Sequence, residues 1–99
     1  MANFRSEAID NLFKAMLSFE SVEQFYSFFD DVCTITELRD MAQRFEVAKM
    51  LEEGSNYQKI AGATGVSTAT ISRVSRCLNY GNGGYKTALE KLKEYEEKN

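Results

Sequence analysis

The 99-residue sequence contains no histidine and no proline, and it has only two cysteines. Histidine is the commonest general base and a frequent metal ligand, so its absence removes many catalytic and metal-binding patterns. There is also no activated-nucleophile pattern and no phosphate loop of the GxxxxGK type, and the glycines of YGNGGY lack the strand–helix context of a nucleotide site. Cys33 and Cys77 lie far apart without metal-ligand spacing, and we expect reduced, buried thiols. The sequence therefore predicts no enzyme, no metal and no cofactor.

Long apolar runs are absent as well. No stretch is long enough to span a membrane, and the first ten residues, MANFRSEAID, lack the basic and then apolar pattern of a secretory segment. We expect a cytoplasmic protein without a membrane partner. A chain of this length forms one small domain, residues 1–99, whose core is marginal by itself because short chains bury a lower fraction of their surface. Association with a second copy would add the missing burial.

Acidic residues are missing from one continuous segment. The whole chain has a net charge of −3, but residues 1–53 carry −6 and residues 90–99 carry −1. Residues 54–89 contain no acid and four bases, Lys59, Arg73, Arg76 and Lys86. Because the local potential steers a polyanion more than the global charge does, this segment is a candidate for contact with nucleic acid.

Apolar spacing and capping signals predict an all-α chain with six helices and no strand. The first helix starts near Arg5 or Ser6 and ends around Phe19. Ser21 and Gln24 form a capping box for the second helix, and Thr34 and Glu37 form one for a third helix that ends near Glu53. Ser55 and Gln58 form another for the fourth helix, and the last helix covers residues 85–97 after a turn-rich linker, residues 79–84.

The second helix carries apolar residues on several sides, including Phe25, Phe28 and Phe29. A helix of this kind needs more than one neighbour, and in so small a domain we expect a second subunit to supply one. Residues 1–53 are therefore predicted to be the dimerisation helices of a homodimer.

The segment from Tyr57 to Arg76, YQKIAGATGVSTATISRVSR, has the pattern of a helix-turn-helix. Ala61 is small enough for a close helix crossing, Gly65 allows a left-handed turn, and Ser67 can cap the second helix. Ile71 and Val74 point inward at a spacing of three. A helix-turn-helix over residues 55–78 is the prediction, and an ordinary helical hairpin is the alternative.

In a helix-turn-helix, the N-terminal part of the second helix reads base edges, and the start of the first helix lies near the phosphates. Short hydroxyl and methyl side chains predict few direct base contacts, and the arginines can bind guanine or phosphate. The predicted DNA-binding residues are Tyr57, Gln58, Lys59, Ser67, Thr68, Ala69, Thr70, Ser72, Arg73 and Arg76.

From Thr34 to about Leu92, the sequence resembles the Trp repressor family, in particular its Trp-repressor-related YerC/YecD type. The resemblance is carried by TITELRDMAQR, GATGVSTATISR and YKTALEKL. It implies an all-helical, six-helix Trp-repressor-like fold, an intertwined homodimer and binding to double-stranded DNA. It also implies a ligand pocket at the positions of Thr34, Arg44, Arg73, Val74 and Cys77.

Two of these positions depart from the tryptophan-binding member of the family. Val74 stands where that member has a glycine that leaves room for the indole ring, and Cys77 replaces a serine. We therefore expect a transcriptional repressor that reads DNA as a dimer and does not respond to tryptophan. An unidentified small-molecule effector remains open. The alternative function is a helix-turn-helix that serves as a protein-interaction module with negligible DNA affinity.

Overall fold

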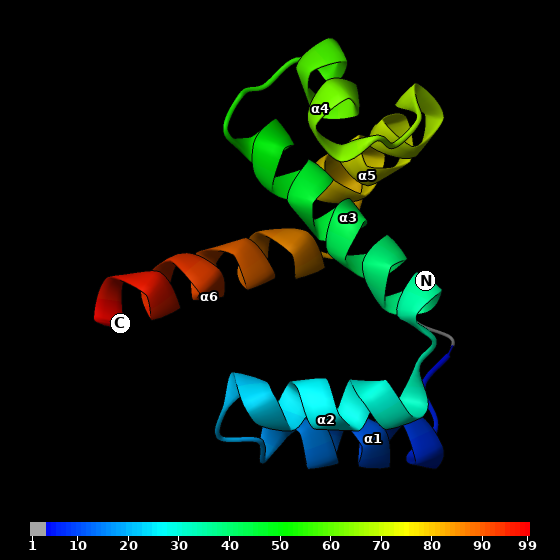
Figure 1. Cartoon of the computed structure of the whole chain (residues 1–99), viewed down its shortest axis with the longest axis vertical. Coiled ribbons are helices and arrows are strands. Elements are labelled where there is room, and N and C mark those ends of the chain that lie inside the picture. The colour runs from blue at the N-terminus through cyan, green and yellow to red at the C-terminus, as the bar shows by residue number, and fades with distance from the viewer. Residues whose placement is uncertain (1–3) are drawn as a thin grey trace. The chain divides into compact units, whose positions relative to one another are not determined.

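The structure is a computed structural model that describes residues 4–99, and in this range it consists of helices without a strand (Figure 1). The helices are α1 (Glu7–Leu17), α2 (Val22–Val32), α3 (Ile35–Glu52), α4 (Tyr57–Thr64), α5 (Thr68–Tyr80) and α6 (Gly84–Lys98). The predicted all-α fold with six helices is confirmed. The chain forms two compact units, an N-terminal unit that ends at Leu38 and a C-terminal unit, Arg39–Asn99.

Side-chain caps begin the first two helices, as their sequences predict. The Ser6 hydroxyl accepts from the backbone N–H of Ile9 at 3.1 Å, and the Ser21 hydroxyl accepts from that of Gln24 at 3.3 Å. The predicted capping box at Ser21 is only half correct. The Gln24 side chain accepts from the backbone N–H of Glu20 instead of Ser21, so the reciprocal bond reaches one residue further back.

The capping box that opens α3 is complete. The backbone N–H of Thr34 donates to Glu37 Oε1 at 2.8 Å, and the backbone N–H of Glu37 donates to Thr34 Oγ1 at 3.1 Å. The Thr34 hydroxyl donates to the same carboxylate oxygen at 3.1 Å. The backbone bond, and then the hydroxyl bond, lower the pKa of Glu37 because both stabilise the charged carboxylate.

The cap of α4 corrects the sequence analysis. Asn56, and not Ser55, is the N-cap, and its side chain accepts from the backbone N–H of Lys59 at 2.8 Å. Ser55 belongs to the end of α3, because its N–H donates to the carbonyl of Met50 at 3.0 Å and the N–H of Gly54 donates to that of Leu51 at 3.0 Å. Gly54 has a φ of 87°, so this is a helix end closed by a left-handed glycine.

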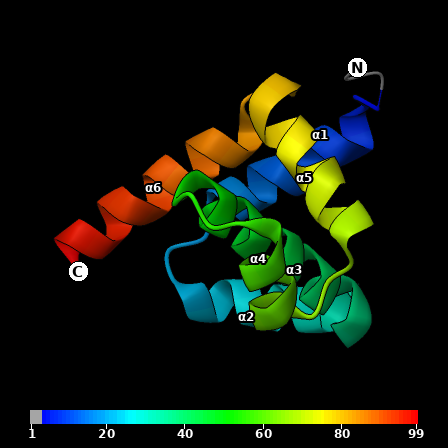
Figure 2. The same cartoon turned by 90° about the horizontal axis from the view of Figure 1, so that it is seen from above.

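The core lies in the C-terminal unit and joins α3, α4 and α5. Its fully or nearly fully buried side chains are Val47, Ala48, Ile60, Ile71 and Val74. Partly buried residues cover it, including Ala61 and Val66 near the turn and Tyr85 and Leu89 of α6. Each fully buried aliphatic side chain contributes on the order of 1.5–3 kcal/mol relative to exposure. Figure 2 shows α3, α4 and α5 from above.

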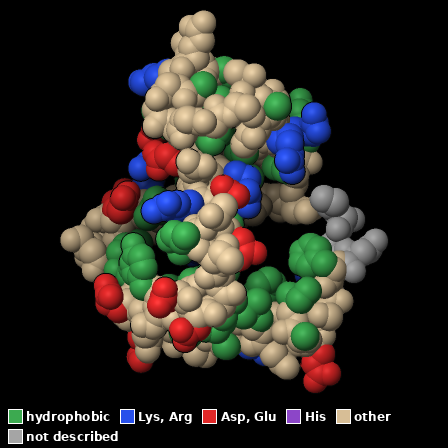
Figure 3. Space-filling view, turned by 45° about the vertical axis from the view of Figure 1, so that its right-hand side comes forward, with side chains coloured by type: hydrophobic (Ala, Val, Ile, Leu, Met, Phe, Trp, Pro, Cys, Tyr) green, Lys and Arg blue, Asp and Glu red, His purple; other side chains and the backbone are tan. Residues whose placement is uncertain are grey.

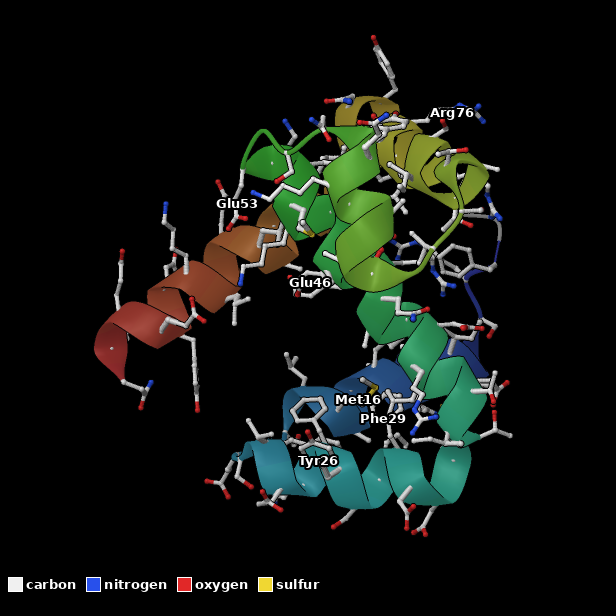
Figure 4. The ribbon with its side chains drawn as sticks, turned by 45° about the horizontal axis from the view of Figure 1, so that its top comes forward. Met16, Tyr26, Phe29, Glu46, Glu53 and Arg76 are labelled. Atoms are coloured by element: carbon white, nitrogen blue, oxygen red, sulfur yellow. The ribbon has the colours of Figure 1, made fainter. Side chains whose placement is uncertain are left out.

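In the described part of the N-terminal unit, residues 4–38, no side chain is buried, although α1 and α2 are regular helices. Its aromatic rings touch edge to face: the Phe19 ring lies 4.7 Å from Phe25 and 5.6 Å from Phe28, and Phe28 lies 5.5 Å from Phe29 between ring centroids. Leu17 stays 86% exposed and Tyr26 64% exposed. Figure 4 labels three of the apolar side chains of this unit, Met16 on α1 and Tyr26 and Phe29 on α2.

Two smaller expectations were wrong. Cys77 is exposed and Cys33 is half-buried, so neither thiol is buried, and both are free. Asn79 and Tyr80 belong to α5, which leaves a shorter connection to α6 than predicted. Among the described helices, none is both long and apolar enough to cross a membrane.

Candidate nucleic-acid interface

A tight turn joins α4 to α5. Gly65 has a φ of 76°, and its N–H donates to the carbonyl of Ala61 at 2.9 Å. A Cβ at Gly65 would meet no atom within 4 Å, so the left-handed backbone and not crowding requires glycine here. Ser67 begins α5 by accepting from the N–H of Thr70 at 3.2 Å. The expected turn and cap of a helix-turn-helix are therefore both present.

Thr64 fastens this turn from the side of α4. Its hydroxyl donates to the carbonyl of Ile60 at 2.7 Å and accepts from the N–H of Val66 at 3.4 Å. The Gln43 side chain of α3 donates to the carbonyl of Thr64 at 3.4 Å. The turn is thus tied both to its own helix and to α3, which limits the positions that α5 can take.

One side of α5 is buried and the other is open. Ile71 is fully buried, Val74 is 2% exposed and Leu78 is 6% exposed, so this spacing marks the face that packs on the core. Ser67, Thr68, Ala69, Ser72, Arg73 and Arg76 are exposed, and Thr70 is half-buried. The expected division of the helix between inward Ile71 and Val74 and outward polar residues is confirmed. Arg76 points away from the helix in Figure 4.

The exposed bases of this region are not neutralised by neighbouring acids. Within residues 4–99 the one ion pair joins Lys91 to Glu94 at 3.7 Å, on the exposed surface of α6. Lys59, Arg73 and Arg76 thus have no carboxylate partner among the described residues, and residues 54–89 contain no acid. Figure 3 shows Lys and Arg side chains standing out on the face that α4 and α5 form. This part of the surface offers positive charge to an anionic partner.

The start of α4 adds groups of the same character. Tyr57 is 37% exposed, and Gln58 and Lys59 are also exposed. The side chain of Asn56 accepts from Lys59 N–H, so the backbone N–H groups of Tyr57 and Gln58 have no capping bond. Unpaired amides at a helix start, beside a lysine, can bind a phosphate oxygen.

The residues of the predicted ligand pocket lie in different settings. Arg44, Arg73 and Cys77 are exposed, whereas Val74 is packed into the core. Thr34 belongs to the N-terminal unit, and its hydroxyl is engaged in the cap of α3. The two hollows described on the C-terminal unit have other linings. One lies between α3 and α6 and has a volume of about 250 Å³, and the other lies between α3 and α4 at about 340 Å³.

Two features of α5 were not anticipated from the sequence. Leu78 is a buried residue of this helix, and Tyr80 at its end is 87% exposed. The spacing of Leu78 from Ile71 and Val74 carries the signal for burial, since seven and four residues return to the same side of a helix. The sequence predicts a linker at Tyr80 because Gly81, Gly83 and Gly84 follow it so closely. No group of three or more His, Cys, Asp or Glu side chains that could hold a metal occurs among residues 4–99.

Comparison with known proteins gives a consistent picture. The profile of the family described as Trp repressor protein matches residues 7–93. The uncharacterized protein YerC of Bacillus subtilis (strain 168) is 56% identical over 92 residues, which cover 93% of this chain and 88% of YerC. The resemblance expected from the sequence is thereby confirmed.

Two solved structures have the same fold. A TrpR-like protein from Eubacterium eligens ATCC 27750 is 52% identical, with a TM-score of 0.87, over 93% of this chain and 95% of its own. A crystal structure of a candidate Trp repressor from Staphylococcus aureus is 46% identical, with a TM-score of 0.86, over 91% and 90% of the two chains. The arrangement of helices described above is therefore shared with these proteins.

Proposed function

Because this chain belongs to the Trp repressor family, we propose that it is a transcriptional repressor that binds specific duplex DNA as a homodimer. The members of this family are DNA-binding helix-turn-helix regulators and not enzymes. One observation carries the proposal for this chain. Ile71, Val74 and Leu78 anchor α5 on the core, and this leaves its other side open with two unpaired arginines.

In the proposed complex, the start of α5 lies in the major groove. Thr68 and Ser72 present hydroxyls that donate or accept, and Ala69 presents a methyl group that can contact thymine. These short side chains read few base edges directly, and water can bridge the rest. Arg73 and Arg76 bind guanine or phosphate, as either position is open to solvent.

The phosphate backbone supplies most of the proposed affinity. Lys59, the amides at the start of α4 and the two arginines of α5 lie in a stretch of sequence without acids. Each cation that neutralises a phosphate releases a counterion, so binding should weaken as salt is added. Residues 54–89 hold only four bases in each chain, and two copies are needed for more than a modest charge.

The N-terminal unit supports the proposed dimer. It exposes apolar side chains such as Leu17, Phe13 and Val22 and buries none. Several exposed apolar side chains on one small unit favour an interaction site, and a second copy of the chain offers the same side chains in return. A two-fold dimer would present two α5 helices to half-sites about 34 Å, or one helical turn of DNA, apart.

The proposed function is tested by measuring DNA affinity against salt concentration. Genomic fragments selected by the protein serve as the DNA. The Lys59→Ala, Arg76→Ala double variant should lose affinity and reduce the log–log salt slope by about two units for each chain that contacts phosphate. Lys98→Ala, which removes an exposed lysine from the end of α6, is the matched control and should leave the slope unchanged.

If the wild-type protein selects no genomic fragment, the DNA-binding role is refuted. The helix-turn-helix would then be a protein-interaction module. If the double variant binds with the affinity and the salt slope of the wild type, binding is real but uses a different surface.

We further propose that tryptophan is not the effector. Val74 is 2% exposed and packs in the core with Val47 and Ile71, so its isopropyl group leaves no open space for a ring at this position of α5. Inserting a ring there would strain a packed core by typically about 1–3 kcal/mol, and 1.4 kcal/mol is about tenfold in affinity. Calorimetric titration should therefore detect no tight tryptophan binding to the wild type.

The Val74→Gly variant sharpens this test. Tryptophan binding that is gained only in the variant would show that the pocket persists and that the valine closes it. Micromolar binding to the wild type would refute the steric argument. Because the variant also removes a buried side chain, its fold is checked by circular dichroism before titration.

A further inference from the structure

Tyr80 is the last residue of α5, and 87% of it is exposed. No other large hydrophobic side chain of the described chain is more open to solvent. Exposure of so much aromatic surface has no benefit for the stability of the chain. The side chain of the neighbouring Asn79, in contrast, is hydrogen-bonded within the helix, because it donates to the carbonyl of Ser75 at 2.9 Å.

The position of Tyr80 on the helix is informative. Ala69, Arg73, Arg76 and Tyr80 follow one another at spacings of four, three and four residues, which places them on a single line along the helix. This line lies opposite the buried line of Ile71, Val74 and Leu78. Tyr80 thus continues, by just over one further turn, the outward face that carries the two unpaired arginines.

The length of α5 places this tyrosine beyond the base edges. Eleven residues separate Ala69 from Tyr80, or about 16 Å along the helix at 1.5 Å per residue. The major groove is only about 12 Å wide. When Ala69 lies at the bases, a helix of this length that runs across the groove brings its far end to the sugar–phosphate wall.

We propose that Tyr80 is a further DNA-contacting residue, whose phenol hydroxyl donates a hydrogen bond to a phosphate oxygen at the edge of the bound groove. This inference rests on the proposed DNA-binding function. Tyrosine is among the side chains that position proteins on the backbone in this way. The segment around it favours the contact, since no acid occurs from residue 54 to residue 89 to repel the phosphate. The bond carries no sequence information, so it fixes the orientation of α5 on the duplex.

A neutral donor leaves a signature that a cation does not. A lysine or arginine that binds phosphate releases a counterion, and its loss reduces the salt slope. The tyrosine hydroxyl releases none, so its loss lowers affinity without changing the slope. The experiment is therefore fluorescence anisotropy with the selected DNA fragment and full-length Tyr80→Phe, Tyr80→Ala and Arg76→Ala, each over a range of salt concentrations.

Tyr80→Phe should weaken binding by about tenfold at every salt concentration, with the wild-type slope, since a hydrogen bond to a charged acceptor is worth about that factor. Tyr80→Ala should weaken binding at least as much, whereas Arg76→Ala should flatten the slope. The loss should be the same on selected and on scrambled DNA. Tyr95→Phe is the matched control, because Tyr95 is 57% exposed near the end of α6, and it should bind like the wild type.

Wild-type affinity in both Tyr80 variants would overturn the inference and leave the DNA-binding function intact. If Tyr80→Ala lost affinity and Tyr80→Phe bound like the wild type, the proposed hydrogen bond would be refuted. The ring and not the hydroxyl would then make the contact. Absence of binding by the wild type itself would refute the proposed function as well, so the two failures are distinguishable. The thermal unfolding midpoints of all variants should match, since Tyr80 is exposed.

Discussion

The two units of this chain have equally regular helices but very different burial. In the C-terminal unit, five side chains from three helices form a closed core. In the N-terminal unit, α1 and α2 are capped by Ser6 and Ser21, yet neither helix buries a residue. Caps contribute on the order of 1 kcal/mol, which does not offset the conformational entropy of ordering two helices. The difference teaches that local signals suffice to specify a helix and that its stability needs a partner surface.

The units also differ in charge. Residues 1–38 contain seven acids and two bases, whereas residues 39–99 contain eight acids and ten bases, with no acid in residues 54–89. An acidic surface repels DNA and a basic one attracts it. The acidic, apolar helices and the basic helix-turn-helix thus agree with the two tasks that we propose for them, association between copies of the chain and contact with DNA.

The largest effect should come from the N-terminal unit. Phe29→Ala removes an aromatic side chain that touches Phe28 and that we expect to become fully buried in the dimer. Folding and dimerisation should weaken together by roughly 3–5 kcal/mol. Sedimentation equilibrium and denaturant unfolding at two protein concentrations measure both changes. Ser27→Ala on the same helix is the control, and a compact, stable wild-type monomer at micromolar concentration would break the comparison.

A substitution in the core of the C-terminal unit should lower the free energy of unfolding by a similar or smaller amount. Ile71→Ala removes a fully buried side chain that anchors α5 and should cost about 2–5 kcal/mol. DNA affinity should fall because α5 is less firmly held, while the association of N-terminal helices persists. Denaturant unfolding, sedimentation and anisotropy on one sample separate these effects. Dissociation of the dimer in this variant, with DNA binding retained, would contradict the assignment of tasks to the two units.

The cap that begins α3 should have a more modest effect. Thr34→Ala removes the acceptor of the Glu37 N–H, which lies 3.1 Å away, and should cost about 0.5–2 kcal/mol. Thr34→Ser keeps the hydroxyl and should recover most of the loss. Equal unfolding midpoints for Thr34→Ala and wild type would show that α3 is held by its packing alone.

The smallest effect is a pH dependence at the same cap. The pKa of Glu37 is lowered in the folded chain, first by the backbone N–H of Thr34 and then by its hydroxyl. Its contribution to stability is therefore present above the unfolded pKa, about 4.3, and is lost as the pH falls through the lower folded pKa. Glu37→Gln should flatten the acid limb of a plot of unfolding midpoint against pH. An acid limb that is unchanged in Glu37→Gln would show that other carboxylates cause the loss of stability at low pH.

Local sequence predicted the interactions that span three or four residues. The Thr34–Glu37 box, the left-handed Gly65 and the Ser67 cap were all expected and are present. Prediction failed where two local signals competed. Ser55 and Asn56 are both good caps, and Ser55 closes α3 through Met50 and so leaves Asn56 to begin α4.

The sequence by itself determined the helices, their order, the turn between α4 and α5 and the segregation of charge, because these depend on residues close together in the chain. Only the tertiary structure decided which apolar side chains are buried. It brought Val47 of α3 into the core with Ile60 and Ile71, left Cys77 and Tyr80 exposed, and buried none of the apolar side chains of α1 and α2 completely. Burial depends on contacts between residues far apart in sequence, and periodicity reports only that a helix has an apolar face, not which surface covers it.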